Sequence, residues 1–181
     1  MERCRLVFSG SGGQGVITAA IVLAEAAVIH EGLISVQAQS YGPEARGGAT
    51  RSDVIISDSE IYFPKVNQPN VLVCLTQEAY NKFYTIIRPG GLLITDTRFV
   101  KTVEKVDARQ RELPMYETVM EKIGKPIVFN ILMLGALISL TEAVRPESVM
   151  KVIETRIPPA FLEMNRKSLQ MGVDLGREFR S

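Results

Sequence analysis

Cysteine and histidine are scarce in this chain of 181 residues, which has two cysteines and one histidine. Cys4 and Cys74 each stand in an apolar run, match no metal or iron–sulfur spacing and do not suffice for a disulfide framework. His30 falls in the last turn of an expected buried helix, where we expect a structural role. With no serine–histidine–acid set and no H-E-x-x-H, the sequence predicts no catalytic residue and no metal site in this chain.

Strong charge imbalance and long apolar runs are also missing. The formal net charge of +1 argues against a general affinity for nucleic acid or membrane surfaces. The most apolar segment, Ile127 to Leu140, is too short to span a bilayer, and the first ten residues lack the apolar stretch of a signal peptide. We therefore expect a cytoplasmic protein, folded as a single domain over residues 1–181.

Apolar runs alternate with helical patterns, which is typical of a parallel sheet. Strands are expected at Leu6 to Phe8, Leu33 to Ala38, Arg51 to Ser57, Glu60 to Phe63, Val71 to Leu75 and Leu92 to Thr95. Helices are expected at Val16 to Glu31, Gln77 to Ile87, Tyr116 to Ile123, from Pro126, at Pro146 to Thr155 and from Phe161. The predicted fold is α/β, a Rossmann-like doubly wound, mostly parallel sheet with a short hairpin about Asp58-Ser59 and a helical C-terminal third.

A glycine-rich segment, FSGSGGQGVITAA, follows the first expected strand and leads into the first helix. It satisfies G-x-G-x-x-G, in which glycines permit a tight turn and a helix N-terminus attracts an anion. The predicted phosphate-binding residues are Gly10, Ser11, Gly12, Gly13, Gln14 and Gly15. An NAD site would need an acid at the end of the second strand, and Gln37 to Ser40 supply none. The alternative is that the glycines only let the helix pack closely on the strand.

A second unusual segment, QSYGPEARGGATRSDV, begins where the second strand is expected to end. Arg46 and Arg51 flank its paired glycines, and arginines suit planar recognition of phosphate or carboxylate. We add Ser40 and Tyr41 to the predicted site, because this loop should share a rim with the first one at the carboxyl ends of the strands. The alternative is an ion pair between Arg46 and Glu44 within the loop.

Three further polar or small-residue features have structural explanations. Asp96 ends a strand, where capping or turn formation is the preferred interpretation. Asn130 interrupts an apolar helix and needs a hydrogen-bond partner in the core. Glycines at Gly172 and Gly176 lie on one seam of the last helix, which either packs on its own domain or contacts another subunit.

The two loops, together with NILMLGAL in the apolar helix, resemble the gamma subunit of 2-oxoacid:ferredoxin oxidoreductases over nearly the whole chain. The second loop is more similar to 2-oxoglutarate members than to pyruvate members. The resemblance implies alpha, beta and ferredoxin-like partner subunits, thiamine diphosphate and iron–sulfur clusters in those other chains, and ferredoxin as electron acceptor. It also implies coenzyme A (CoA) as co-substrate, with no cofactor held tightly by this chain. A lysine that family members often carry before the Asn165 region is missing here.

The expected function is therefore a non-catalytic gamma subunit that offers CoA phosphates a rim of glycines and arginines. One alternative is an assembly subunit whose loops dock onto alpha and touch no ligand. Another is a free-standing oxidoreductase that binds NAD or a flavin. Self-association of the isolated chain into a homodimer, through an exposed apolar face, stays open.

Overall fold

The structure, a computed structural model, describes residues 3–40, 48–103 and 105–180. The strands are β1 (Cys4–Gly10), β2 (Ile34–Ser40), β3 (Thr50–Ser57), β4 (Val71–Cys74), β5 (Gly91–Asp96) and β6 (Ala108–Leu113). The α-helices are α1 (Val16–Glu25), α2 (Gln77–Phe83), α3 (Met115–Lys122), α4 (Phe129–Thr141), α5 (Pro146–Arg156) and α6 (Pro159–Glu178). Short 3₁₀ turns are η1 (Gly12–Gln14), η3 (Tyr84–Ile86) and η4 (Pro126–Val128), and η2 (Ala26–His30) is a π-helical turn.

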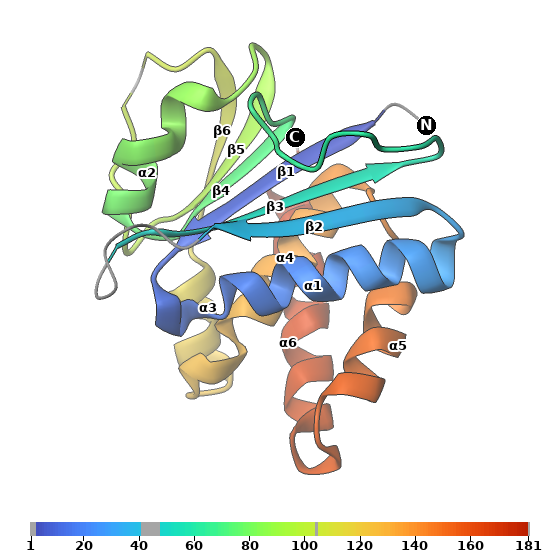
Figure 1. Ribbon diagram of the computed structural model, residues 1–181. Coiled ribbons are helices and arrows are strands. Elements are labelled where there is room, and N and C mark those ends of the chain that lie inside the picture. Colours follow the sequence, from blue (N-terminus) through green and yellow to red (C-terminus); the bar gives the residue numbers. More distant parts are fainter. Residues whose placement is uncertain (1–2, 41–47, 104, 181) are drawn as a thin grey trace.

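The six strands form one sheet in the order β2-β3-β1-β4-β5-β6 (Figure 1). Strands β1, β4, β5 and β6 run parallel to one another, whereas β3 is antiparallel to both of its neighbours. Helices lie on both faces, with α2 on one and α1, α3, α4, α5 and α6 on the other. The predicted doubly wound, mostly parallel α/β fold with a helical C-terminal third is confirmed.

The hairpin predicted about Asp58-Ser59 is wrong. Residues 60–66 form no strand, and β3 pairs instead with β2 on one side and β1 on the other. Strand β2 consequently lies beside β3, not beside β1 as a simple β1–α1–β2 unit would place it. The periodicity of β3 identified a strand correctly, but periodicity carries no information about which strand is its neighbour.

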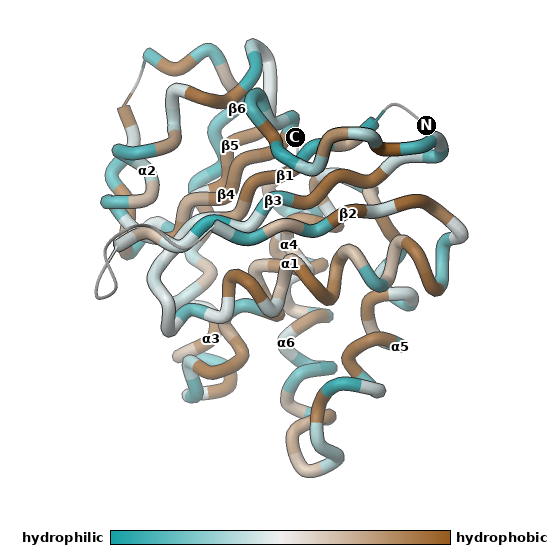
Figure 2. Tube along the Cα trace, viewed as in Figure 1, coloured by the Kyte–Doolittle hydropathy of each residue, from teal (hydrophilic) through white to brown (hydrophobic). Residues whose placement is uncertain are grey.

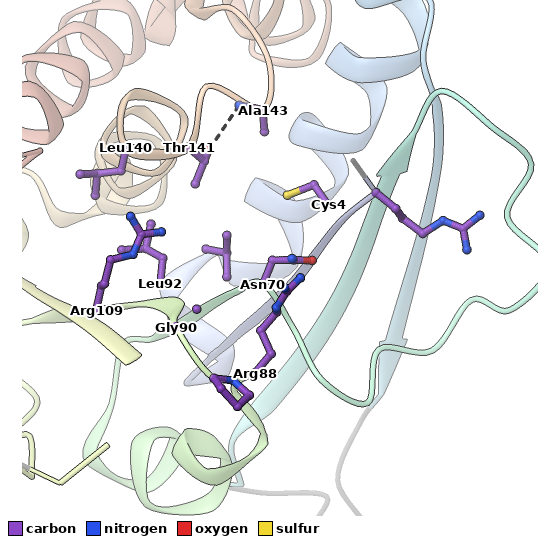
Figure 3. Close-up of a pocket in the computed structure, with 13 residues that line it drawn as sticks. Cys4, Asn70, Arg88, Gly90, Leu92, Arg109, Leu140, Thr141 and Ala143 are labelled. Carbon is purple, nitrogen blue, oxygen red and sulfur yellow. Dashed lines mark hydrogen bonds between the residues drawn. The ribbon is translucent and has the colours of Figure 1, made fainter. Parts of the chain in front are cut away.

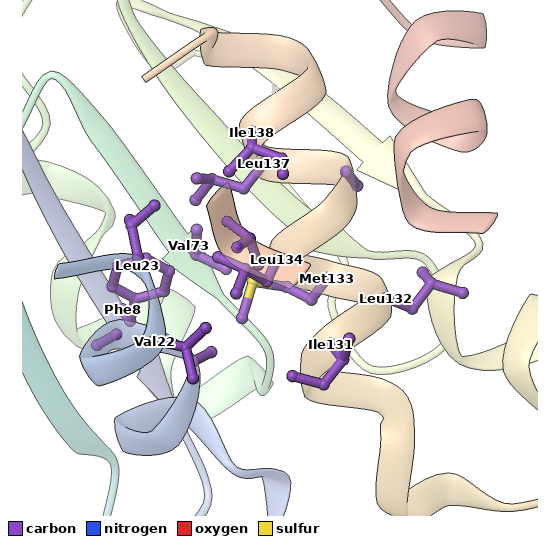
Figure 4. Close-up of a cluster of buried hydrophobic side chains, with 14 of the residues drawn as sticks. Phe8, Val22, Leu23, Val73, Ile131, Leu132, Met133, Leu134, Leu137 and Ile138 are labelled. Atoms are coloured by element: carbon purple, nitrogen blue, oxygen red, sulfur yellow. The ribbon is translucent and has the colours of Figure 1, made fainter. Parts of the chain in front are cut away.

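Two separate apolar cores lie against the two faces of the sheet. Alternate residues of β1 show this, because Leu6 and Phe8 belong to the core under α1 and α4, while Val7 belongs to the core under α2. Figure 4 shows the first core, where Phe8 and α1 side chains meet Met133 and Leu134 of α4. Apolar residues are concentrated along β1, β4 and β5 in Figure 2, as expected of strands that are covered on both faces.

The predicted helix from Val16 to Glu31 is helical throughout, but its last part widens into the π turn before Gly32 ends it with φ +67°. Strand β6 was not predicted. Its sequence, ARQREL, contains no β-branched residue and places charged side chains at the edge of the sheet. Edge strands tolerate such composition, so hydrophobic periodicity does not detect them.

Helix α6 packs its small-residue seam on α4 of the same chain. A Cβ added at Gly172 would overlap the carbonyl group of Leu132, and one at Gly176 would lie 2.6 Å from the carbonyl oxygen of Ala136. Glycine at these positions lets the two helix backbones approach closely, as small residues do at tight helix crossings. Of the two interpretations of this seam, packing within the chain is therefore the correct one for these glycines.

Candidate functional site

The glycine loop between β1 and α1 is held by the side chain of Gln14. Its Oε1 accepts a hydrogen bond from the Ser11 N–H (2.9 Å), and its Nε2 donates one to the carbonyl of Leu75 at the end of β4 (3.1 Å). A single amide thus fixes the turn and ties it to the next parallel strand. The Gln14 side chain, predicted to bind phosphate, is occupied in shaping the loop.

Two of the four loop glycines are required by packing inside the chain. A Cβ at Gly10 would lie 2.5 Å from Gln14 Oε1 and 2.9 Å from a methyl group of Val16. Gly15 adopts φ +69°, a left-handed conformation that favours glycine, and its Cβ would lie 2.6 Å from Asn130 Nδ2. Asn130 in turn donates to the Gly15 carbonyl (3.3 Å), which confirms its predicted core hydrogen bond.

The other two, Gly12 and Gly13, have no such explanation. A Cβ at either position would meet no atom within 4 Å, and neither residue has a positive φ. Backbone conformation and packing would therefore both permit a side chain here. The absence of one leaves the loop backbone open to close approach from outside, directly before the N-terminus of α1.

The second loop begins and ends beside the glycine loop. Ser40, the last residue of β2, is paired with Arg51 of β3, which is also paired with Ser9 of β1. The hydroxyl of Thr50 donates to the Gly10 carbonyl (2.9 Å), so the start of β3 is fixed to the end of β1. The ends of the two loops lie on one rim, as predicted. Tyr41 and Arg46, and with them the alternative of an Arg46–Glu44 pair, lie outside the described residues.

The register also sends Arg51 to the opposite face from α1. Its guanidinium lies 5.5 Å from the ring centre of Phe83 in α2, forms an ion pair with Asp53 (2.7 Å) and donates to the Val66 carbonyl. Nε and Nη2 are occupied by these contacts, and among the described residues Nη1 has no hydrogen-bond partner. Because residues directly opposite in a sheet share a face, Ser40 lies on the Arg51 side as well.

A cavity of about 490 Å³ adjoins the glycine loop on the α1 face. Its lining combines the loop and α1 with η4, α4 and the start of α6: Gly13, Gln14, Gly15, Thr18, Val22, Pro126, Ile127, Val128, Asn130, Ile131, Arg156, Ile157, Pro158, Phe161, Met164 and Asn165. Ile127 and Phe161 are 72% and 47% exposed, unusual for large apolar side chains. Sequence reasoning missed this cavity because its walls come from segments more than a hundred residues apart.

The polar side chains of the cavity are largely satisfied within the protein. Arg156 donates to Glu25 of α1 from two nitrogens, and this contact, mainly its hydrogen bonding, lowers the pKa of Glu25 and raises that of Arg156. Asn165 donates to the Phe161 carbonyl (2.9 Å). A mostly apolar pocket with a few fixed polar groups beside a helix N-terminus is suited to an elongated ligand that carries a phosphate.

Asp96 has the structural role that was preferred for it. Its two carboxylate oxygens accept the N–H groups of Arg98 (2.9 Å) and Tyr116 (2.8 Å), which closes the turn after β5 and starts α3. Burial raises its pKa, although these hydrogen bonds oppose the shift. Burial also raises the pKa of Cys74 to about 12, which makes its thiol unreactive in the folded chain.

The described residues offer neither a group of metal ligands nor a membrane-spanning helix. Within residues 3–40, 48–103 and 105–180, no three His, Cys, Asp or Glu side chains are grouped so that they could hold a metal ion. No helix in the described ranges is both long and apolar enough to cross a membrane.

Comparison with known proteins shows similarity over nearly the full chain. The family model described as pyruvate ferredoxin/flavodoxin oxidoreductase matches residues 5–175. The 2-oxoglutarate synthase subunit KorC of Methanocaldococcus jannaschii is 43% identical over 97% of this chain and 95% of its own length.

Two solved structures show the same fold. The gamma subunit of a keto/oxoacid ferredoxin oxidoreductase from Geobacter sulfurreducens is 41% identical, with a TM-score of 0.86, over 96% of this chain and 98% of its own. The second is the 2-oxoglutarate:ferredoxin oxidoreductase of Magnetococcus marinus, which was solved with 2-oxoglutarate, CoA and succinyl-CoA bound. It is 21% identical in sequence, and its TM-score of 0.88 covers 98% of this chain and 32% of its own. The resemblance found in the two loops is thus confirmed, and this chain belongs to the pyruvate ferredoxin/flavodoxin oxidoreductase family.

Proposed function

We propose that this chain is the gamma subunit of a 2-oxoglutarate:ferredoxin oxidoreductase. The observation that carries the proposal is full-length identity above 40% to proteins named as the corresponding subunit. The overall reaction converts a 2-oxoacid and CoA to acyl-CoA and carbon dioxide while ferredoxin is reduced. Thiamine diphosphate and iron–sulfur clusters belong to alpha, beta and ferredoxin-like partner subunits, in the cytoplasm.

Within that enzyme, the glycine loop and the adjoining cavity receive CoA. A CoA phosphate lies against the open backbone of Gly12 and Gly13, where the α1 N-terminus favours negative charge. The pantetheine arm follows the apolar wall formed by Ile127 and Phe161, whose exposure is then explained. CoA is a reasonable candidate ligand because the Magnetococcus marinus enzyme, which shares this fold over 32% of its chain, was solved with CoA bound.

The other predicted residues serve the same site in different ways. Gln14, which is held by Ser11 and Leu75, positions the loop. Ser40 ends β2 at this rim. Tyr41 and Arg46, which lie outside the described residues, are part of the proposed CoA site on the sequence of the second loop alone. Arg51, which contacts Phe83 on the α2 face and is bound to Asp53 and Val66, stabilises the start of β3 at this rim and does not face the cavity.

The function is tested by reconstitution with the purified alpha, beta and ferredoxin-like subunits. The complete enzyme should reduce ferredoxin only when 2-oxoglutarate and CoA are both present. Its kcat/KM should be at least tenfold higher for 2-oxoglutarate than for pyruvate or 2-oxoisovalerate. A preference for either of those acids would overturn the 2-oxoglutarate assignment, and full activity without this chain would overturn its role as a subunit.

The CoA site is tested with Gly12→Asp, and Gly12→Asn serves as the matched control. A Cβ at Gly12 meets no atom within 4 Å, and the aspartate and asparagine side chains have nearly the same shape and differ essentially in charge. A carboxylate at the glycine loop should weaken CoA binding by about 1–2 kcal/mol, so KM for CoA should rise about 5- to 30-fold for the aspartate variant relative to the asparagine variant. Equal KM values for the two would favour the assembly-only alternative. Calorimetric titration of NAD and a flavin into the isolated chain tests the third alternative, which requires binding.

A further inference from the structure

Two hollows lie at the amino ends of the parallel strands, at the opposite end of the sheet from the glycine loop. One, of about 480 Å³, opens on the α4 face, where it is lined by Leu92, Leu140 and Thr141 (Figure 3). The other, of about 900 Å³, opens on the α2 face beside Ile55 and Phe63. The two share Arg3, Arg88 and Pro89 in their linings, so together they form a groove around the amino ends of the strands, which we call the amino-edge groove.

Positive charge dominates the lining of the amino-edge groove. Its basic residues are Arg3, Arg5, Lys65, Arg88 and Arg109, and none of the residues that line either hollow is aspartate or glutamate. Arg3 donates to the backbone carbonyl of Glu60, an acceptor without a formal charge. In the described part of the chain, no acidic partner contacts the side chains of Arg5, Lys65 or Arg109. The five basic residues are therefore a local excess of positive charge in a protein whose net charge is only +1.

The groove is too long for one small anion. Arg5 is on β1 and Arg109 is on β6, three strands away in the sheet, so their backbones are about 14 Å apart at a spacing of about 4.8 Å per strand. Figure 3 shows Arg88 and Arg109 on either side of Gly90. Phe63 lines the second hollow and is 60% exposed. Arginines with an exposed aromatic side chain are the composition of a protein–protein interface.

We propose that the amino-edge groove docks an acidic, extended segment of a partner subunit of the same enzyme. This proposal rests on the function proposed above, since it requires the assembled complex. The groove lies at the end of the strands away from the glycine loop, so a partner bound there leaves the CoA site accessible. Its charges would speed association and select an acidic partner, effects that salt weakens.

The test measures the affinity of this chain for the purified alpha–beta complex by biolayer interferometry at 50 and 300 mM NaCl. Lys65→Glu and Arg109→Glu reverse two exposed groove charges, and Lys151→Glu is the matched control, an exposed lysine on α5 outside the groove. We expect each groove variant to bind about 5- to 10-fold more weakly at low salt with a smaller salt dependence. The control should stay within about twofold of the wild type. Thermal denaturation of all variants checks that they fold.

The outcomes separate this proposal from the proposed function. If the wild-type chain does not bind alpha–beta at all, both are overturned. If it binds but the groove variants bind equally well, only the docking proposal is overturned. A third arm titrates inorganic pyrophosphate into the isolated chain. Binding that Lys65→Glu and Arg109→Glu abolish, with assembly unchanged, would overturn a protein partner in favour of a small anion.

Discussion

Gly15→Ala should be among the most damaging single-methyl additions in this chain. Gly15 adopts φ +69°, and its Cβ position lies 2.6 Å from Asn130 Nδ2 and 2.8 Å from Asn130 Cγ. The substitution therefore strains the backbone and displaces the side chain of Asn130, a residue that is only 8% exposed. It also breaks the hydrogen bond from Asn130 to the Gly15 carbonyl, a contact that joins α4 to the first turn of α1.

The magnitude follows from three contributions. An alanine in the left-handed region costs about 1–2 kcal/mol. Loss of the Asn130 hydrogen bond removes about 1 kcal/mol, and leaving the displaced amide without a partner adds about 1 kcal/mol or more. We expect the free energy of unfolding to fall by about 3–4 kcal/mol. In Gly15→Ala/Asn130→Ala, the truncated side chain makes room, so the double variant should lose at least about 1 kcal/mol less than the sum of the single variants.

Urea denaturation followed by circular dichroism measures these free energies. Gly12→Ala is the matched control, because its Cβ meets no atom within 4 Å and its φ is not positive. We expect it to change stability by no more than about 0.5–1 kcal/mol, in the stabilising direction if at all. A Gly15→Ala protein as stable as Gly12→Ala would refute the reasoning about the loop glycines.

Two further predictions concern titratable groups. Burial raises the pKa of Glu31, but hydrogen bonds from Ser148 and Arg145 outweigh this effect and hold the pKa below its usual value. Ionised Glu31 therefore stabilises the folded state above about pH 4.5, and this stabilisation is lost as pH falls through the lowered pKa. Glu31→Gln should flatten the acid side of the stability–pH profile in urea titrations, and an unchanged profile would contradict this. Cys74, with its pKa raised to about 12 by burial, should react with Ellman's reagent at pH 8 only after unfolding, as measured at 412 nm with Cys74→Ser as control.

Local sequence determined most of the secondary structure and the character of the first loop. Apolar runs such as Leu6 to Phe8 mark strands buried on both faces, and the glycine-rich turn before Val16 predicts a helix N-terminus that can attract an anion. Gly32 and Pro146 mark helix boundaries for reasons of backbone conformation alone. These features depend on each residue and its near neighbours, so the sequence is sufficient to identify them.

Strand order, register and the distribution of side chains over the two faces were decided by tertiary structure. Insertion of β3 between β2 and β1 sends Arg51 toward α2, away from the glycine loop with which it had been grouped. The cavity beside Gly13 and the amino-edge groove form where distant segments pack together. Only the tertiary structure shows that a side chain at Gly10 or Gly15 would clash with neighbouring residues. A Cβ at Gly12 or Gly13 would meet no atom within 4 Å. Periodicity reports which residues of a strand share a face, but non-local packing decides what each face meets.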